Sequence, residues 1–164
     1  MLDTSLLSLV ALLPLAGALV LALLPGRPVA LHRWLALGLS LLVFILSCVV
    51  WLRFDANLPT FQLQEQFAWI PQFGISYHIG VDGISLLLVL LTTLLIPVVI
   101  LASWSSIDTH VKGFHISLLL LTTGMIGAFV ALDLFLFYVF WELMLIPMYF
   151  IIGVWGGPRR IYAA

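Results

Sequence analysis

Five long apolar runs, separated by short polar connections, divide this chain almost from end to end. About 20 apolar residues, each rising about 1.5 Å along a helix, cross the roughly 30 Å hydrocarbon core of a bilayer. Inside a bilayer the backbone must satisfy its own hydrogen bonds, so each run is expected to form a helix. We therefore predict an all-α integral membrane protein with about five transmembrane helices in a single membrane segment, residues 1–164. The runs are Leu6–Leu24, Trp34–Leu52, Ile84–Trp104, Phe114–Val130 and Leu134–Trp155.

The composition excludes a soluble enzyme. The 164 residues are 64% hydrophobic and 8% charged, whereas a soluble domain carries about 25% charged residues. The net charge of −1 gives no indication of nucleic-acid binding. The single cysteine, Cys48, has no partner for a disulfide. No metal site is expected, because the histidines are not grouped with cysteine or with paired carboxylates: His32, His78, His110 and His115.

The basic residues predict the orientation of the chain in the membrane, because loops rich in Lys and Arg stay on the cytoplasmic side. Five of the six basic residues fall in connections that alternate onto one side. The N-terminus is therefore predicted outside, the C-terminus inside, and residues 53–83 form one longer outside loop. The five residues on the inside are Arg27, Arg33, Lys112, Arg159 and Arg160.

The outside loop is the segment with the most polar residues. Its stretch Phe61–Gln64 alternates apolar and polar side chains, which is typical of a strand, so a short hairpin or an interfacial segment is expected. Asp82 directly precedes the third apolar run, and Asp133 precedes the fifth. A carboxylate at that place accepts hydrogen bonds from the first amides of a helix and lies at its positive end. We therefore predict that both aspartates cap helices.

A patch of small residues marks the fourth run. Gly124, Gly127 and Ala128 would let another helix approach closely. The fourth and fifth runs are joined by little more than residues 131–133, which makes them antiparallel neighbours. The patch is therefore expected to serve ordinary packing between helices.

Glu142 is the residue that the membrane prediction explains least. It lies in the middle of the apolar run Leu134–Trp155. Inserting a carboxylate there costs at least about 2.5 kcal/mol, so it needs a partner, water or a proton. Burial raises the pKa of a carboxyl group and a nearby Lys or Arg lowers it, so a movable partner would make Glu142 a proton relay. The alternative is a structural carboxylate held in one hydrogen bond to a neighbouring helix.

Three further residues are candidates to support Glu142. Helical spacing places Tyr138, Glu142 and Tyr149 on one face of the helix. Pro147 cannot donate to the carbonyl of Leu143, and a freed carbonyl is a place to hold water.

The remaining titratable groups carry weaker hypotheses. His110 and His115 flank the third inside connection and titrate near neutral pH, so they are candidates for proton entry, with solvated loop histidines as the simpler interpretation. The sequence contains no nucleotide-binding loop, haem motif, cysteine cluster or catalytic triad. Any redox chemistry is therefore expected in another subunit.

The run from Asp133 to Gly157 closely resembles subunit M of the proton-pumping NADH–quinone oxidoreductase, the counterpart of mitochondrial subunit four. The blocks Phe140-Trp141-Glu142 and Pro147-Met148-Tyr149 distinguish this subunit from its antiporter-like relatives. Three further stretches agree: residues 80–86 (Gly-Val-Asp-Gly-Ile-Ser-Leu), 101–104 (Leu-Ala-Ser-Trp) and 160–164 (Arg-Ile-Tyr-Ala-Ala).

The resemblance implies a many-helix subunit related to cation/proton antiporters, with two inverted repeats of five helices. In that family a glutamate matching Glu142 pairs with a lysine on a later, broken helix, as part of a proton path driven by quinone reduction elsewhere. NADH, flavin, iron–sulfur clusters and quinone would be held by partner subunits, with no cofactor in this chain. The implied setting is the inner (cytoplasmic) membrane, where this multi-pass chain would contact the lipid bilayer and other membrane subunits of respiratory complex I.

The chain departs from the family in one respect. The family continues well beyond Ala164, and no lysine lies in the five predicted runs. The chain is therefore expected to be an N-terminal fragment or the first piece of a split subunit. Whether it is an enzyme by itself is uncertain, but as part of the complex it would belong to a proton-translocating NADH–quinone oxidoreductase. The alternatives are a subunit of a multi-subunit cation/proton antiporter or membrane hydrogenase, or an inactive fragment.

Overall fold

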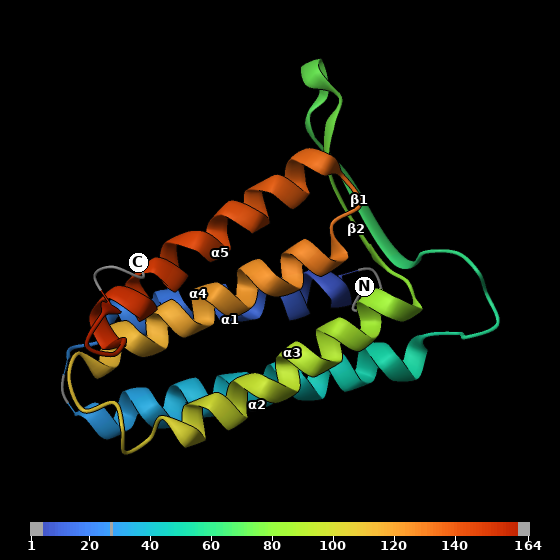
Figure 1. The fold of residues 1–164 in the computed structure, drawn as a ribbon. Helices are drawn as coiled ribbons and strands as arrows, with labels where there is room; N and C mark the ends of the chain where they lie inside the picture. Colours follow the sequence, from blue (N-terminus) through green and yellow to red (C-terminus); the bar gives the residue numbers. More distant parts are fainter. Residues whose placement is uncertain (1–4, 27, 161–164) are drawn as a thin grey trace.

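The computed structural model describes residues 5–26 and 28–160, and within them five helices are long and apolar enough to cross a membrane. The predicted membrane-protein class with about five transmembrane helices is confirmed. A two-stranded hairpin lies between the second and third helices (Figure 1). The elements are α1 (Leu6–Leu23), α2 (Val29–Arg53), β1 (Gln62–Ile70), a short 3₁₀ turn (Pro71–Phe73), β2 (Ile75–Val81), α3 (Gly83–Ala102), α4 (Val111–Val130) and α5 (Leu134–Trp155).

The helix bounds differ from the apolar runs mainly at the predicted inside ends. α2 begins at Val29 rather than Trp34, and α4 begins at Val111 rather than Phe114. Both extensions add a basic residue, Arg33 or Lys112, to the first turns of a helix. Hydropathy marks where the apolar stretch begins, but hydrogen bonding lets a helix continue into the polar region beside it. α3 ends earlier than predicted, at Ala102, because Ser103 and Trp104 form a turn.

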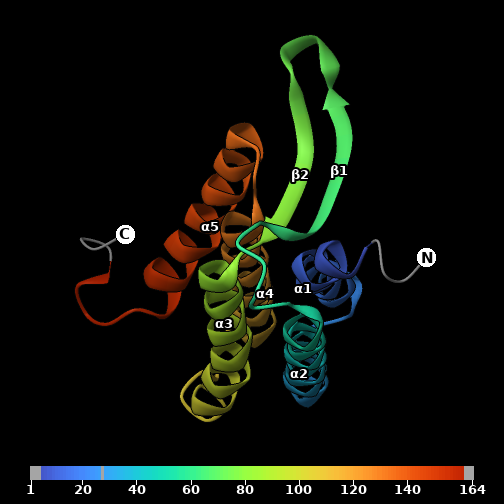
Figure 2. The same ribbon diagram turned by 90° about the vertical axis from the view of Figure 1, so that its right-hand side faces the viewer.

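The helices lie side by side with α4 at the centre of the contacts. α4 packs against α1, α3 and α5, while α2 packs mainly against α3 and α1. α5 rests on the outer side of α4, and the hairpin extends beyond the bundle past the start of α5 (Figures 1 and 2). Consequently 17% of an 18-residue stretch of α5 is buried, against 56% for α4.

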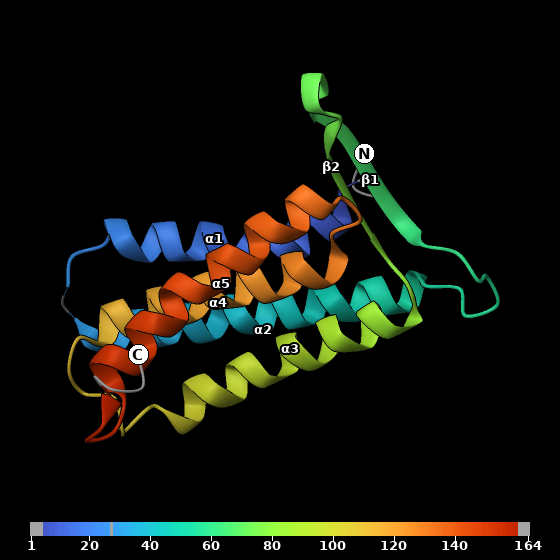
Figure 3. The same cartoon turned by 45° about the horizontal axis from the view of Figure 1, so that its top comes forward.

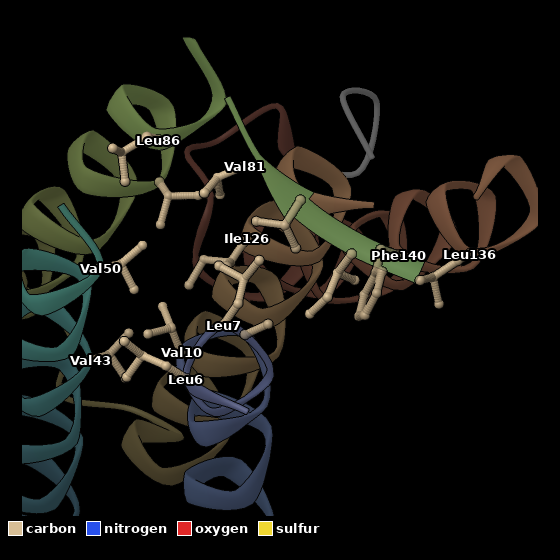
Figure 4. Packing of buried hydrophobic residues seen from close by; sticks show 14 residues of the cluster. Leu6, Leu7, Val10, Val43, Val50, Val81, Leu86, Ile126, Leu136 and Phe140 are labelled. Carbon is tan, nitrogen blue, oxygen red and sulfur yellow. The ribbon is translucent and has the colours of Figure 1, made fainter. Parts of the chain in front are cut away.

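Two apolar clusters hold the bundle together, one near the hairpin and one near the opposite end. The first joins α1, α2, α3, α4, the hairpin and the start of α5 (Figure 4). The second joins α1, α2, α3 and the first half of α4. Between them, buried hydroxyls cross the bundle, and Ser47 Oγ and Thr93 Oγ1 lie 2.7 Å apart. Fully buried members of the two clusters include Leu7, Val10, Val50, Ile79 and Ile126 in the first and Leu21, Ala36 and Ile100 in the second.

The small residues of α4 let α5 lie close to it. A Cβ added to Gly127 would overlap the ring of Phe140, and one added to Gly124 would lie 3.0 Å from the backbone nitrogen of Met144. Both neighbours belong to α5, so the predicted role of this patch in close packing of the fourth and fifth helices is confirmed.

The predicted hairpin is present and antiparallel, with Phe67 opposite Tyr77. Its turn contains Gly74 at φ 69°, in the left-handed region that glycine tolerates. The pairing is irregular between Gln62 and Glu65, where Leu63 has φ 51°. Such a bulge re-aims the side chains beside it. Figure 3 shows the hairpin running across the helix ends near the start of α1.

Three helices begin at the hairpin end, and carboxylates accept from their first amides. Glu65 of β1 accepts from the backbone nitrogens of Leu7 and Ser8 in α1, at 2.9 and 3.0 Å, and also from the Ser8 hydroxyl. Asp82 accepts from the amides of Ile84 and Ser85, which completes a capping box at α3.

Asp133 caps α5 and also holds the hairpin. It accepts from the amides of Phe135 and Leu136 with one oxygen and from the amide and hydroxyl of Ser76 in β2 with the other. These bonds lower the pKa of Asp133, with the Ser76 amide as the largest cause. The pKa of Asp82 is lowered in the same way, chiefly by the amide of Ser85. The two predicted aspartate caps are therefore confirmed.

The α4–α5 contact gives a first testable prediction. Gly127→Ala should lower the free energy of unfolding by about 1–3 kcal/mol, because the new methyl group overlaps the Phe140 ring. The matched control is Gly38→Ala in α2, where nothing lies within 4 Å of an added Cβ. That control should raise stability by about 0.4–1 kcal/mol. Unfolding titrations in detergent measure both, and equal effects would contradict the close contact.

The Asp133 cap gives a second prediction, on pH. Because the folded state lowers its pKa, ionised Asp133 stabilises the fold above the unfolded pKa of about 3.9, and this contribution is lost as pH falls through the lowered folded value. Asp133→Asn keeps an acceptor at the cap but has no charge to titrate. The Tm of the wild type should therefore fall further than that of Asp133→Asn between about pH 5 and 3. Parallel pH dependence in thermal scans would contradict this assignment.

Candidate proton-transfer site

Glu142 lies eight residues after the first residue of α5, which is about 12 Å along the helix. The buried residues of α5 are Leu136, Phe140 and Pro147, and they mark the side that packs on the bundle. Glu142 is on the other side and is exposed in this chain. The carboxylate is therefore at mid-membrane depth on the side of α5 that the other four helices leave open.

The predicted polar stripe of α5 lies on that open side. The Tyr138 hydroxyl lies near the Glu142 carboxylate, which is one turn further on and interacts with it. Tyr149 is also exposed and packs its ring on Phe150, with centroids 5.8 Å apart. Tyr138, Glu142 and Tyr149 thus share one side, as the spacing predicted, and a proton on the carboxylate has the Tyr138 hydroxyl as its first neighbour.

Pro147 lies away from this stripe. Its side chain is buried on the side of α5 that packs against α4, whereas Glu142 is on the opposite side. Leu143, whose carbonyl loses its usual helical donor at Pro147, also packs toward the apolar cluster. The structure therefore does not bring the Pro147 ring to the carboxylate.

Lys112, which was expected in a connection between helices, lies within α4. Lys112 lies in the first turn of α4, so the expectation that no lysine falls in a spanning helix is wrong. Its ammonium donates to the carbonyls of Ala22 and Leu24, at 2.8 and 2.7 Å, at the end of α1. A cation at the carbonyl end of a helix is favourable. Lys112 thus bonds to backbone carbonyls at the end of α1 rather than to Glu142.

The two histidines considered for proton entry differ in position. His110 is exposed and has no side-chain hydrogen bond that caps α4. His115 is 3% exposed, so its interpretation as a solvated loop histidine is wrong. Its spacing is the missed signal, because Val111, His115 and Leu118 recur at helical intervals along one buried stripe.

Glu65 is a polar site that sequence reasoning missed. It is the buried acidic residue among those described, at 5% exposure, and it belongs to a network with Ser8 and Tyr77. The Tyr77 hydroxyl lies 2.8 Å from Ser8 Oγ. Burial raises the pKa of Tyr77 and the charge of Glu65 raises it further, while the bond to Ser8 opposes them. Local pattern offers no signal for this network, because Glu65 meets amides 57 and 58 residues away.

Metal binding finds no support in the part of the chain described. Within it, no three His, Cys, Asp or Glu side chains gather as a metal site would require. Cys48 is a half-buried free thiol in α2. Glu142, with Tyr138 near it, is a titratable group within the apolar length of α5.

Comparisons with known proteins show which proteins this chain is similar to. Residues 131–164, which include all of α5, match the family described as NADH:quinone oxidoreductase/Mrp antiporter, TM. The chain is 48% identical over 164 residues to NADH-quinone oxidoreductase subunit M of Rhodobacter capsulatus, covering 98% of this chain and 31% of that protein. It is 46% identical over 152 residues to NADH-ubiquinone oxidoreductase chain 4 of Chondrus crispus, covering 93% of this chain and 31% of that protein.

The fold has a counterpart among solved structures. A chain in the structure of respiratory complex I from Thermus thermophilus with bound NADH superposes with a TM-score of 0.78 and 28% sequence identity. The match covers 96% of this chain and 31% of that one. The chain thus spans 31% of the length of each of these proteins. The predicted resemblance is confirmed, because in sequence and fold this chain matches part of subunit M and chain 4 proteins.

Proposed function

We propose that this chain forms the N-terminal part of a proton-translocating membrane subunit of NADH–quinone oxidoreductase, with Glu142 as a proton relay. The observation that carries the proposal is the position of Glu142. A carboxylate lies at mid-depth of an apolar helix, on its open side, within the segment that matches the family. An ionisable residue at such a depth is typical of a proton pathway.

An ionised Glu142 needs a cation on the open side of α5. An uncompensated carboxylate at the centre of a helix in lipid costs at least about 2.5 kcal/mol, and a nearby cation or a bound proton removes that cost. A basic side chain on a further segment of the full-length subunit, or of a neighbouring subunit, would supply the cation. Approach and withdrawal of that cation would then make Glu142 release and bind a proton.

The neighbouring residues have separate roles in this proposal. Tyr138 donates to the ionised carboxylate and holds it on the open side. Tyr149 extends the polar side of α5 toward its inside end, where a chain of water could form. Pro147 acts on the other side, by weakening the helix next to Leu143 and easing its adjustment against α4.

The redox chemistry belongs to other subunits in this proposal. NADH, flavin, iron–sulfur clusters and quinone would bind there, and their reaction would drive proton transfer through Glu142. The chain would be a multi-pass component of the inner (cytoplasmic) membrane, beside other membrane subunits of the complex. The N-terminus and the hairpin would face outside and the C-terminus inside, because the basic residues gather at the other end.

A second candidate function follows from the description of the matching family, which also names the Mrp antiporter. A cation/proton antiporter subunit would use the same carboxylate of α5 without NADH. The two functions differ in their driving force, so proton movement that follows NADH oxidation separates them from movement that follows an imposed sodium or potassium gradient.

A third prediction tests the relay. In the full-length subunit, Glu142→Gln should reduce NADH-driven proton translocation at least about tenfold, because the amide cannot accept and release a proton. Glu142→Asp should keep part of the activity. Proton uptake is followed with a pH-sensitive dye in inverted membrane vesicles, and the amount of assembled complex is checked on native gels.

The matched control is Asp55→Asn, which neutralises an exposed loop carboxylate bonded to Asn57 and should leave translocation unchanged. Normal translocation by Glu142→Gln in a normally assembled complex would refute the relay. Loss of assembly without loss of translocation per complex would identify Glu142 as structural.

A further inference from the structure

Two buried polar atoms stand out at the end of the bundle opposite the hairpin. Among the buried polar side-chain atoms in the described part of the chain, two nitrogens have no hydrogen-bond partner in the protein. They are His32 Nε2 and Arg33 Nε. They belong to consecutive residues near the start of α2. Buried polar groups are almost always hydrogen-bonded, so two such atoms on consecutive residues need a cause.

The hydrogen bond on the other side of the His32 ring determines what Nε2 needs. Nδ1 lies 3.2 Å from the carbonyl oxygen of Pro28. A carbonyl can only accept, so Nδ1 carries the hydrogen, and Nε2 of the neutral ring presents a lone pair. His32 is 0% exposed, so bulk solvent does not reach this acceptor.

Arg33 has a hydrogen-bond donor that lacks an acceptor. Its Nη2 donates to the carbonyl of Ile107 at 2.9 Å, and its guanidinium carbon lies 5.7 Å from the centre of the Trp104 ring. These contacts orient the guanidinium toward the connection between α3 and α4. Its Nε–H is always a donor and has no acceptor in the protein. Two neighbouring residues thus carry one hydrogen-bond acceptor and one donor without partners in the protein. A single water molecule can donate to the acceptor and accept from the donor.

We propose that an internal water site lies at the start of α2, where one water donates to His32 Nε2 and accepts from Arg33 Nε–H. Water is the ligand that fits, because it supplies a donor and an acceptor from one atom and requires no charge. An anion could accept from Arg33 but has no hydrogen for the lone pair of His32.

Further basic side chains lie near this contact. Arg33 and His32 are both near enough to His115 of α4 for their charges to act on it. His115 repeats the same pattern, with Nδ1 2.8 Å from the carbonyl of Val111 and the ring buried. The ammonium of Lys112, one turn before His115, is occupied by the carbonyls at the end of α1. The water would extend this polar contact between α2 and α4 and connect a buried imidazole to the loop surface.

The direct test is cryo-electron microscopy of the protein purified from its native membranes in nanodiscs, with every subunit that co-purifies. At a resolution where other internal waters are visible, a density peak should lie about 2.7–3.2 Å from both His32 Nε2 and Arg33 Nε. No peak there, or a side chain of another subunit bonded to either atom, would overturn the proposal.

A fourth prediction tests the site through two substitutions at one position, in the same preparation. His32→Gln places an amide oxygen close to the former Nε2 and keeps an acceptor for the water, so its Tm should stay close to that of the wild type. His32→Phe keeps a ring of similar shape but removes the acceptor and leaves Arg33 Nε–H without its water. Its Tm should fall by about 2–4 °C.

The sign of the change in Tm that His32→Phe causes distinguishes a hydrated site from a dry one. If the site were dry, removing an unsatisfied nitrogen would leave the Tm unchanged or raise it, and the proposal would fail. Half-buried His78 on the hairpin supplies the control for losing a histidine. Its Nε2 bonds to Gln64 at 3.0 Å, and His78→Gln should leave the two Tm values at position 32 in the same order.

Discussion

The structure depends on the hydrogen bonds between carboxylates and helix starts at the hairpin end. α1, α3 and α5 all begin there, and each leaves amides that a bilayer interface satisfies poorly. Glu65, Asp82 and Asp133 accept from these amides. Two of the carboxylates lie on the hairpin or directly after it, and the third also holds Ser76 of the hairpin. A single two-stranded element therefore connects three helices that are far apart in the sequence.

The opposite end is organised by cations. α2 and α4 begin there, and neither has a side-chain hydrogen bond at its N-cap. Lys112 instead closes the carbonyl end of α1, and Arg33 binds the connection between α3 and α4. Carboxylates at the hairpin end and cations at the opposite end thus bind backbone groups of the opposite partial charge. Glu142 differs from them because it lies within the apolar length of α5.

The parts of this picture that the sequence could predict are those with local causes. Hydropathy identified five helices, and the aspartates directly before two of them identified their caps. Helical spacing placed Tyr138 with Glu142 on one side of α5. Other features depend on residues distant in sequence, as when Glu65 reaches the first turn of α1. Spacing also could not show which side of α5 is open, because both sides of that helix are apolar apart from the stripe.

The open side of α5 determines how Glu142 is to be understood. The close fit of Phe140 against Gly127 commits one side of α5 to α4. Since Glu142 is two residues beyond Phe140, it must point away from that contact, about 200° around the helix. The tight packing that secures α5 is therefore the same constraint that presents the carboxylate outward at mid-membrane. A relay at this position is controlled by whatever covers that side, rather than by the four helices behind it.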